Sequence, residues 1–205
     1  MAHSIAAYCL KHGMRADEIV DDHAESIQMY LDYCRPAGVR RKDMRFEVDL
    51  TPGLQKIDKD MGGTADAVWL EGDELVVTDF KFGTGVAVDP VDNPQLKMYA
   101  LGVLLQTARK VRKVRVVIVQ PRLEDPAQRI REHTFKAVEL MEFAADMEDA
   151  AEKSRAEEPV AVPGEKQCMW CPAAKGNCDV AIKRSSRRPA GARVTIEDFS
   201  VVEAK

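Results

Sequence analysis

Two carboxylates and a lysine in the first half of the chain are residue types that can hold a cation and a phosphate. Asp66 follows Gly-Gly-Thr, and Asp79 and Lys81 follow a run of β-branched residues. Side chains alternate across a strand, so Asp79 and Lys81 share one face. Two carboxylates at one site repel each other unless a cation bridges them, and Mg²⁺ accepts phosphate oxygens in place of water. The stretch therefore predicts metal-assisted phosphate chemistry, in which Lys81 steadies developing negative charge.

A helix after the same stretch supplies two more polar side chains. Asn93 and Pro94 have the residue types of a helix N-cap and a first helical residue. Gln95 and Tyr99 then stand one turn apart on the same helix face. Tyr99 lies among apolar residues, so a place in the core is the alternative to a role at the site.

The elements that must position these residues are hairpin-type strands, then a strand–helix–strand unit, with further helices before and after them. Hydrophobic periodicity and turn residues predict helices at 3–12, 17–34, 93–109 and 135–156, and strands at 44–50, 64–70, 74–82 and 113–120. Asp17 is the expected N-cap of the second helix. Residues 51–63 are expected to form a turn or hairpin connection, and 193–202 a short strand or an extended tail. This order predicts an α/β (α+β mixed) fold with a mixed sheet flanked by helices.

The composition is ordinary for a globular chain without a membrane span. Its 205 residues favour one domain with a small appendage, and 45% of them are hydrophobic. No apolar run reaches about 18 residues, and the first residues lack a secretion signal, so we expect a cytoplasmic protein. The net charge of −4 argues against a broad basic face that coats DNA, but it does not exclude an enzyme with an acidic metal site.

The order of the motifs resembles the PD-(D/E)XK nuclease superfamily in its RecB-like branch. That branch carries an early helix His, then G-x-x-D, D-x-K and Q-x-x-x-Y. Here the matching positions are His3, Gly63 to Asp66, Asp79 to Lys81, and Gln95 to Tyr99. The segments around these positions, and the Gln-Pro-Arg at 120–122, are similar to phage and prophage proteins of the branch and to the CRISPR adaptation nucleases. The resemblance covers nearly the whole chain and implies a restriction-endonuclease-like fold.

The resemblance also implies roles for individual residues. Asp66 and Asp79 would bind Mg²⁺ or Mn²⁺, with the Phe80 carbonyl as an added ligand, and Lys81 would be catalytic. His3 would bring a further metal ligand from the first helix. A histidine so close to the N-terminus can equally be a solvent-exposed residue of a fraying helix.

Three further residues receive roles with open alternatives. Gln95 and Tyr99 would contact DNA or support the catalytic lysine. Glu47, in the preceding strand, would be an acid that supports the metal ligands without binding the metal itself, or would be purely structural. The implied activity is hydrolysis of DNA phosphodiester bonds that leaves a 5′-phosphate, as an exonuclease in phage-type recombination or replication. DNA and a recombination or replication protein would be its partners, in the cytoplasm of a bacterial host.

Three late cysteines, Cys168, Cys171 and Cys178, form a C-x₂-C-x₆-C segment. In RecB-like nucleases with an iron–sulfur cluster, three cysteines come late and the fourth lies before the helix His. The resemblance therefore implies a four-iron, four-sulfur cluster, with zinc as the alternative. The missing fourth ligand leaves three explanations open. The chain starts too late or is shortened, Cys9 or Cys34 substitutes, or the thiols are free or bind zinc with a different fourth ligand.

The domain organisation follows from this division. Residues 1–158 are the expected nuclease core, and 159–205 are a C-terminal cysteine segment and basic tail packed on the same domain. The basic run at 183–188 suits DNA phosphates, with a solvated tail as the equal alternative. A function of another class is also open: a catalytically impaired or truncated nuclease-fold subunit that only binds DNA or assists assembly.

Overall fold

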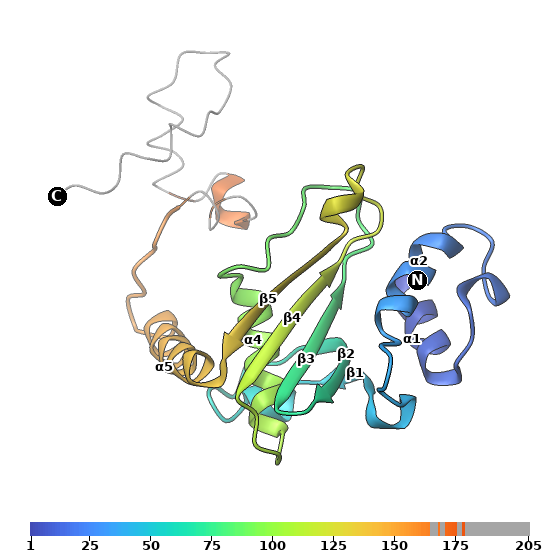
Figure 1. Ribbon diagram of the computed structural model, residues 1–205. Helices are drawn as coiled ribbons and strands as arrows, with labels where there is room; N and C mark the ends of the chain where they lie inside the picture. The colour runs from blue at the N-terminus through green and yellow to red at the C-terminus, as the bar shows by residue number, and fades with distance from the viewer. Residues whose placement is uncertain (165–167, 169–170, 176–177, 179–205) are drawn as a thin grey trace, which may run out of the picture. The chain divides into compact units, whose positions relative to one another are not determined.

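The core of the chain is a five-stranded mixed sheet, with the strands in chain order across it. The computed structural model describes residues 1–164, 168, 171–175 and 178. The strands are β1 (Arg45–Asp49), β2 (Thr64–Glu71), β3 (Glu74–Phe80), β4 (Lys113–Val119) and β5 (Ile130–Lys136). β1, β2 and β3 form an antiparallel meander, β4 is parallel to β3, and β5 is antiparallel to β4 (Figure 1). The predicted mixed sheet is therefore confirmed.

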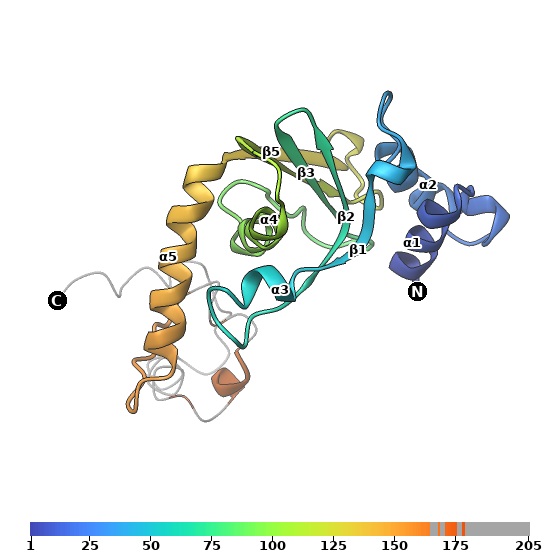
Figure 2. The same cartoon turned by 90° about the horizontal axis from the view of Figure 1, so that it is seen from below.

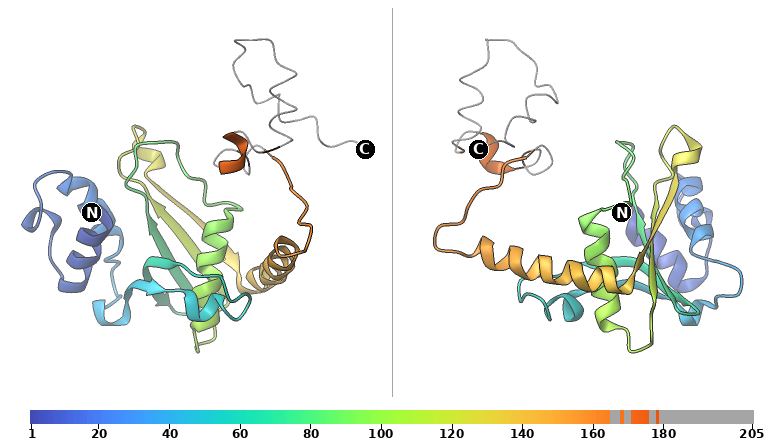
Figure 3. Two further views of the ribbon diagram at one scale, coloured as in Figure 1. Left: turned by 180° about the vertical axis from the view of Figure 1, so that it is seen from behind. Right: turned by 60° about the vertical axis from the view of Figure 1, so that its left-hand side comes forward.

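Helices cover both faces of this sheet. They are α1 (Ala2–His12), α2 (Ala24–Tyr33), α3 (Thr51–Leu54), α4 (Pro94–Gln106) and α5 (Ala137–Ser154). α1 and α2 lie on one face, and α4 lies on the other (Figures 2 and 3). Short 3₁₀ turns occur at Ala16–Glu18, Arg41–Asp43, Pro126–Gln128 and Pro172–Lys175. No helix of the described residues has the length and apolar character needed to cross a membrane.

The two faces of β3 separate the core into two layers. Leu75 and Val77 pack on the α4 side, in a layer we call the α4-side core. Val76 and Phe80 pack against α1 and α2, in a layer we call the α2-side core. This alternation is the one expected for a buried central strand, and it places Asp79 on the α4 side.

α3 and α4 approach each other closely because two glycines face one another. A Cβ atom on Gly53 would overlap the carbonyl oxygen of Gly102, and one on Gly102 would lie 3.1 Å from side-chain atoms of Leu50 and Leu54. This contact fixes the position of α4, the helix that carries Gln95 and Tyr99.

Replacing Gly53 with Ala is expected to destabilise the protein by about 1–3 kcal/mol, because the overlapped atom belongs to a backbone carbonyl that cannot turn away. Gly85→Ala is the matched control, since an added Cβ there meets nothing within 4 Å. Urea unfolding of both variants measures the difference. Equal stability of the two variants would contradict the close approach.

Three parts of the chain differ from the sequence-based expectations. The helix predicted at 17–34 begins only at Ala24, because residues 16–18 form a 3₁₀ turn and His23 is left-handed with φ of 63°. His23, rather than Asp17, is therefore the N-cap. The connection at 51–63 includes the short helix α3. Strand β5 was not predicted at all, because its exposed face is polar and only Phe135 in it is buried.

The chain divides into two units, Met1–Glu152 and Lys153–Lys205. In the described part of the second unit, the amide of Cys168 donates to the Gly164 carbonyl, and the amide of Cys171 donates to the Cys168 carbonyl. The basic run 183–188 and the expected strand or tail 193–202 lie outside the described residues.

Candidate active site

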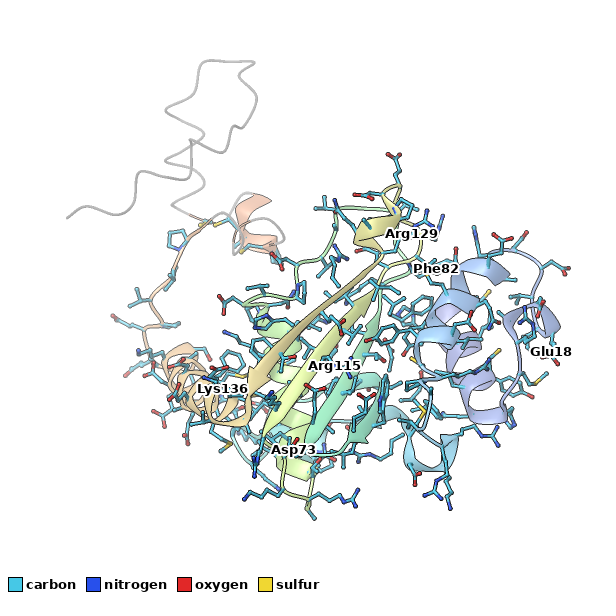
Figure 4. All side chains as sticks on the ribbon, viewed as in Figure 1. Glu18, Asp73, Phe82, Arg115, Arg129 and Lys136 are labelled. Atoms are coloured by element: carbon cyan, nitrogen blue, oxygen red, sulfur yellow. The ribbon has the colours of Figure 1, made fainter. Side chains whose placement is uncertain are left out.

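The motif residues gather at the end of the sheet where the parallel strands β3 and β4 finish. The Lys81 amide donates to the Val119 carbonyl at 2.9 Å, so the ladder continues one residue past β3. Figure 4 shows Phe82 and Arg129 at this end of the sheet and Asp73 at the opposite end. Side chains near residue 81 therefore lie at the end of the central strand, beside the loop that leads to α4.

Asp79 and Lys81 form a close ion pair at this end of the sheet. Lys81 Nζ lies 3.0 Å from Asp79 Oδ2, with the two side chains 28% and 7% exposed. The same carboxylate oxygen is buried and accepts no hydrogen bond of good geometry from the described residues. The Lys81 ammonium neutralises the charge of this oxygen but makes no hydrogen bond of good geometry with it. The buried oxygen therefore retains the capacity to bind a ligand.

Asp66 lies on the neighbouring strand and binds the backbone of β3. Its Oδ2 accepts a hydrogen bond of 2.7 Å from the Phe80 amide. The pKa of the Asp66 carboxyl is raised to about 6, mainly by burial and to a lesser extent by the nearby Asp79 charge. The Phe80 hydrogen bond and the charges of His3 and Lys81 oppose that shift. The two carboxylates thus repel each other across the site.

The raised pKa makes the stability of the metal-free protein depend on pH. The folded carboxyl holds its proton up to about pH 6, whereas its ordinary pKa is 3.8. Stability from this group is therefore full below about pH 4 and is lost as pH rises through 6. Asp66→Asn keeps an oxygen acceptor for the Phe80 amide and cannot ionise.

We therefore expect the metal-free wild type to lose about 1–3 kcal/mol relative to Asp66→Asn between pH 4 and 7. Urea unfolding at several pH values in the presence of a chelator measures this difference. A gap between the two proteins that stays constant over the range would refute the assignment.

His3 reaches the site from the first turn of α1. Its Nε2 lies 2.6 Å from the Phe80 carbonyl oxygen, and its ring centroid lies 5.2 Å from that of Phe80. The Phe80 ring is stacked on Tyr30 at 4.6 Å. Phe80 thus offers its amide to Asp66 and its carbonyl to His3, while its ring is fixed in the α2-side core.

Gln95 and Tyr99 connect Lys81 to the next helix. Lys81 Nζ donates to Gln95 Oε1 at 3.4 Å, and Gln95 Nε2 donates to the Tyr99 hydroxyl at 3.0 Å. The Asn93 side chain accepts from the amides of Gln95 and Leu96, as the predicted N-cap should. These contacts hold the lysine from the α4 side, and Tyr99 also packs against the α4-side core.

Glu47 lies opposite Asp66 in a strained segment of β1. Its φ of 50° is left-handed, a conformation that costs a non-glycine residue about 1–3 kcal/mol. The register pairs Phe46 with Ala67 in the α2-side core and Val48 with Ala65 in the α4-side core. The side chains of β1 and β2 therefore switch from one face of the sheet to the other at this position.

A small hollow opens at this point of the ladder. It is too narrow to hold a water molecule, and its lining consists of His3, Ala7, Leu10, Tyr30, Glu47 and Asp66. It therefore borders both the imidazole and one of the two carboxylates predicted to bind metal.

The ligand types suit a hard divalent cation, although the side chains do not form a complete coordination site. No group of three or more His, Cys, Asp or Glu side chains among the described residues is placed to hold a metal. Asp79 Oδ2 is an unbonded buried oxygen, and the Phe80 carbonyl adds a second oxygen donor. Carboxylate and carbonyl oxygens are the ligands that Mg²⁺ and Mn²⁺ prefer.

Two polar residues near this end of the sheet receive no role from the sequence, although Gln120 belongs to the Gln-Pro-Arg segment of the resemblance. Gln120 is 3% exposed, and it accepts hydrogen bonds from the Val88 amide at 3.2 Å and from Arg131 Nη2 at 2.7 Å. The available signal for Gln120 is a polar residue that directly follows the apolar run 116–119. Arg131 had no such signal, because strand β5 itself was not predicted.

The two early cysteines are buried. Cys9 and Cys34 are fully covered in the α2-side core, and Cys34 Sγ lies 3.7 Å from Thr78 Oγ1. Burial raises the pKa of the Cys34 thiol to about 12, which disfavours the thiolate that zinc or a cluster needs. This environment argues against Cys34 as the substitute ligand. Cys168, Cys171 and Cys178 are partly exposed and form no disulfide.

Comparison with known proteins gives a family and a distantly similar solved structure. A family model described as "Protein of unknown function (DUF2800)" matches residues 2–192. A solved structure described as "Crystal structure of SSO0001" is similar at 14% sequence identity and a TM-score of 0.36, over 87% of this chain and 81% of that chain. A likeness this distant carries no argument about function.

Proposed function

We propose that this chain, which belongs to the DUF2800 family of proteins of unknown function, is a metal-dependent DNA nuclease. Membership supplies no activity, so the proposal rests on the candidate active site. Within it, the observation that carries most weight is the buried Asp79 carboxylate, paired with Lys81 at 3.0 Å and holding one oxygen without a hydrogen bond. A second carboxylate, Asp66, comes from the adjacent strand.

A purely structural ion pair explains this arrangement less well. Burying a charge is costly unless its hydrogen-bonding capacity is met, and burying two repelling carboxylates is more so. Metal-free, the site therefore stores unfavourable energy that a cation would relieve. Sites that keep such perturbed groups together are enriched in catalytic function.

The residues divide the work of phosphodiester hydrolysis between them. A divalent cation bound by Asp66, Asp79 and the Phe80 carbonyl, with His3 as a further ligand, would polarise the scissile phosphate and lower the pKa of the attacking water. Lys81 would face the negative charge that develops on the phosphate oxygens. Gln95, braced by Tyr99, would keep the ammonium group in place.

Cleavage assays on linear and circular DNA test the proposal. Purified protein is incubated with each substrate in Mg²⁺, in Mn²⁺ or in EDTA. Cleavage that needs the metal and stops in EDTA is the expected result, and cleavage of linear DNA alone would identify an exonuclease. DNA binding without cleavage in either metal would refute the nuclease and favour a nuclease-fold binding or assembly subunit.

The proposal also covers the metal centre of the second unit and the process in which the chain takes part. The cysteine segment at 168–178 would hold an iron–sulfur cluster or zinc. The chain would act in phage-type recombination or replication, in the cytoplasm of a bacterial host and beside a protein of that pathway.

A further inference from the structure

Arg131 lies in the same row of the sheet as the proposed metal ligand Asp79. The register pairs Asp79 with Ile118 on β4 and Ile118 with Arg131 on β5. Residues paired across neighbouring strands point to the same face, so all three point to the α4 side. Two strand spacings separate Arg131 from Asp79, which is about 10 Å.

The Arg131 side chain is partly buried and has no carboxylate in contact among the described residues. Its Nη2 donates to Gln120 Oε1 at 2.7 Å, while its Nε is buried and has no hydrogen-bond partner among the described residues. No ion pair within 4.0 Å joins it to an acid in the described part of the chain. Burial lowers the pKa of Arg131, and Asp89 opposes this from a longer range. An anion that reached this side chain would satisfy the buried Nε and offset the partial desolvation of the charge.

Gln120 orients this guanidinium and connects it to the loop after Lys81. Its Oε1 accepts from the Val88 amide as well as from Arg131. Its Nε2 donates to the Val86 carbonyl at 3.3 Å and to the Gly83 carbonyl at 3.5 Å. The amide is therefore fully engaged by the loop, and it leaves the rest of the Arg131 fork for a ligand.

We propose that Arg131 is a phosphate-binding residue for a second phosphate group of the DNA, separate from the phosphate that is cleaved. This inference rests on the proposed nuclease function and adds a contact to the same substrate. With a rise of about 3.4 Å per nucleotide along one strand, 10 Å corresponds to a phosphate within about three nucleotides of the scissile one. The fork of a guanidinium matches the geometry of a phosphate. The phosphate is either an internal one of the backbone or the terminal one of a DNA end.

DNA binding in EDTA separates this contact from catalysis. Arg131→Gln is compared with the control Lys136→Gln, which removes one exposed charge from the other end of the same strand (Figure 4). For Arg131→Gln, the slope of log affinity against log salt concentration should fall by about 0.9, the value of one phosphate contact. For Lys136→Gln, the slope should stay unchanged.

A scan of oligonucleotides that each carry one uncharged methylphosphonate locates the contact. One position should weaken binding of the wild type and have no effect on Arg131→Gln. Oligonucleotides with and without a 5′-phosphate distinguish the two sources, because only a terminal contact loses the Arg131 effect when that group is absent. Should Arg131→Gln fail to fold, Arg131→Lys carries the test, with a reduced effect at the same position.

Two results would overturn the inference. One is an equal salt slope for Arg131→Gln and the wild type, and the other is a scan with no position that depends on Arg131. Cleavage by the wild type would survive either result, so the proposed nuclease would stand. A wild type that binds DNA through Arg131 and never cleaves it would refute the nuclease and keep the phosphate site.

Discussion

Asp79→Asn and Lys81→Met will each lower the rate of DNA cleavage by about 10²–10³-fold or more, the range seen when one charge-stabilising group is removed from an active site. Asp79 supplies the unbonded buried oxygen, and Lys81 supplies the only ammonium group in contact with it among the described residues. Single-turnover cleavage in Mn²⁺ at saturating protein measures the chemical step apart from binding.

The two variants also differ in what they should do to the fold. Asp79→Asn removes a buried charge but leaves Lys81 half-buried without its partner, and Lys81→Met leaves the Asp79 carboxylate unpaired. Both must therefore be shown to be folded by circular dichroism before their rates are compared. Lys97→Met, which removes a lysine paired with Asp92 outside the site, is the control and should cleave normally. Full activity in both site variants would show that the cleavage centre lies elsewhere.

Tyr30→Ala will destabilise the protein by about 3–5 kcal/mol and reduce its cleavage activity. The Tyr30 ring is 1% exposed and stacked on Phe80 at 4.6 Å, with 14° between the ring planes. Phe80 in turn presents its amide to Asp66 and its carbonyl to His3. Losing the ring therefore opens a cavity directly behind the backbone atoms that bind both of these residues.

Tyr30→Phe separates packing from hydrogen bonding. The Tyr30 hydroxyl lies 3.0 Å from Thr78 Oγ1, and that oxygen also donates to the Ala67 carbonyl. Removing the hydroxyl should cost about 0.5–1.5 kcal/mol and leave activity near that of the wild type. Urea unfolding and the same cleavage assay measure both effects. If Tyr30→Ala unfolds no more easily than Tyr30→Phe, the stack does not support Phe80.

The elements that can be predicted from the sequence are those with a clear hydrophobic pattern or a clear helix-start signal. Strand β3 contains a run of β-branched residues, and helix α4 begins at Pro94 after the N-cap Asn93, so the sequence predicts both elements. Strand β5 covers one edge of the sheet and buries only Phe135, so its residues resemble a polar loop. The predicted helix at 17–34 is interrupted because His23 takes a left-handed conformation, which the spacing of apolar residues does not reveal.

The site divides in the same way. Strand alternation puts Asp79 on the face of Leu75 and Val77, and its partner Lys81 contacts Gln95 of α4 on that side. The bond from Asp66 to the Phe80 amide depends on how β2 diverges from β3, and no local pattern encodes this divergence. The left-handed Glu47 and the Gln120–Arg131 contact are likewise products of tertiary packing.

The hydrogen bond between Asp66 and the Phe80 amide has a consequence for comparing relatives of this chain. Any residue that replaces Asp66 must still supply an acceptor for a part-buried N–H, whether or not the protein cuts DNA. A relative that has lost activity would therefore remain under selection to keep Asp or Asn there. Among the described residues, the Lys81 side chain binds no backbone group, and its contacts are with Asp79 and Gln95. Evolutionary drift after loss of function should appear first at Lys81, which makes that position the better marker of an active relative.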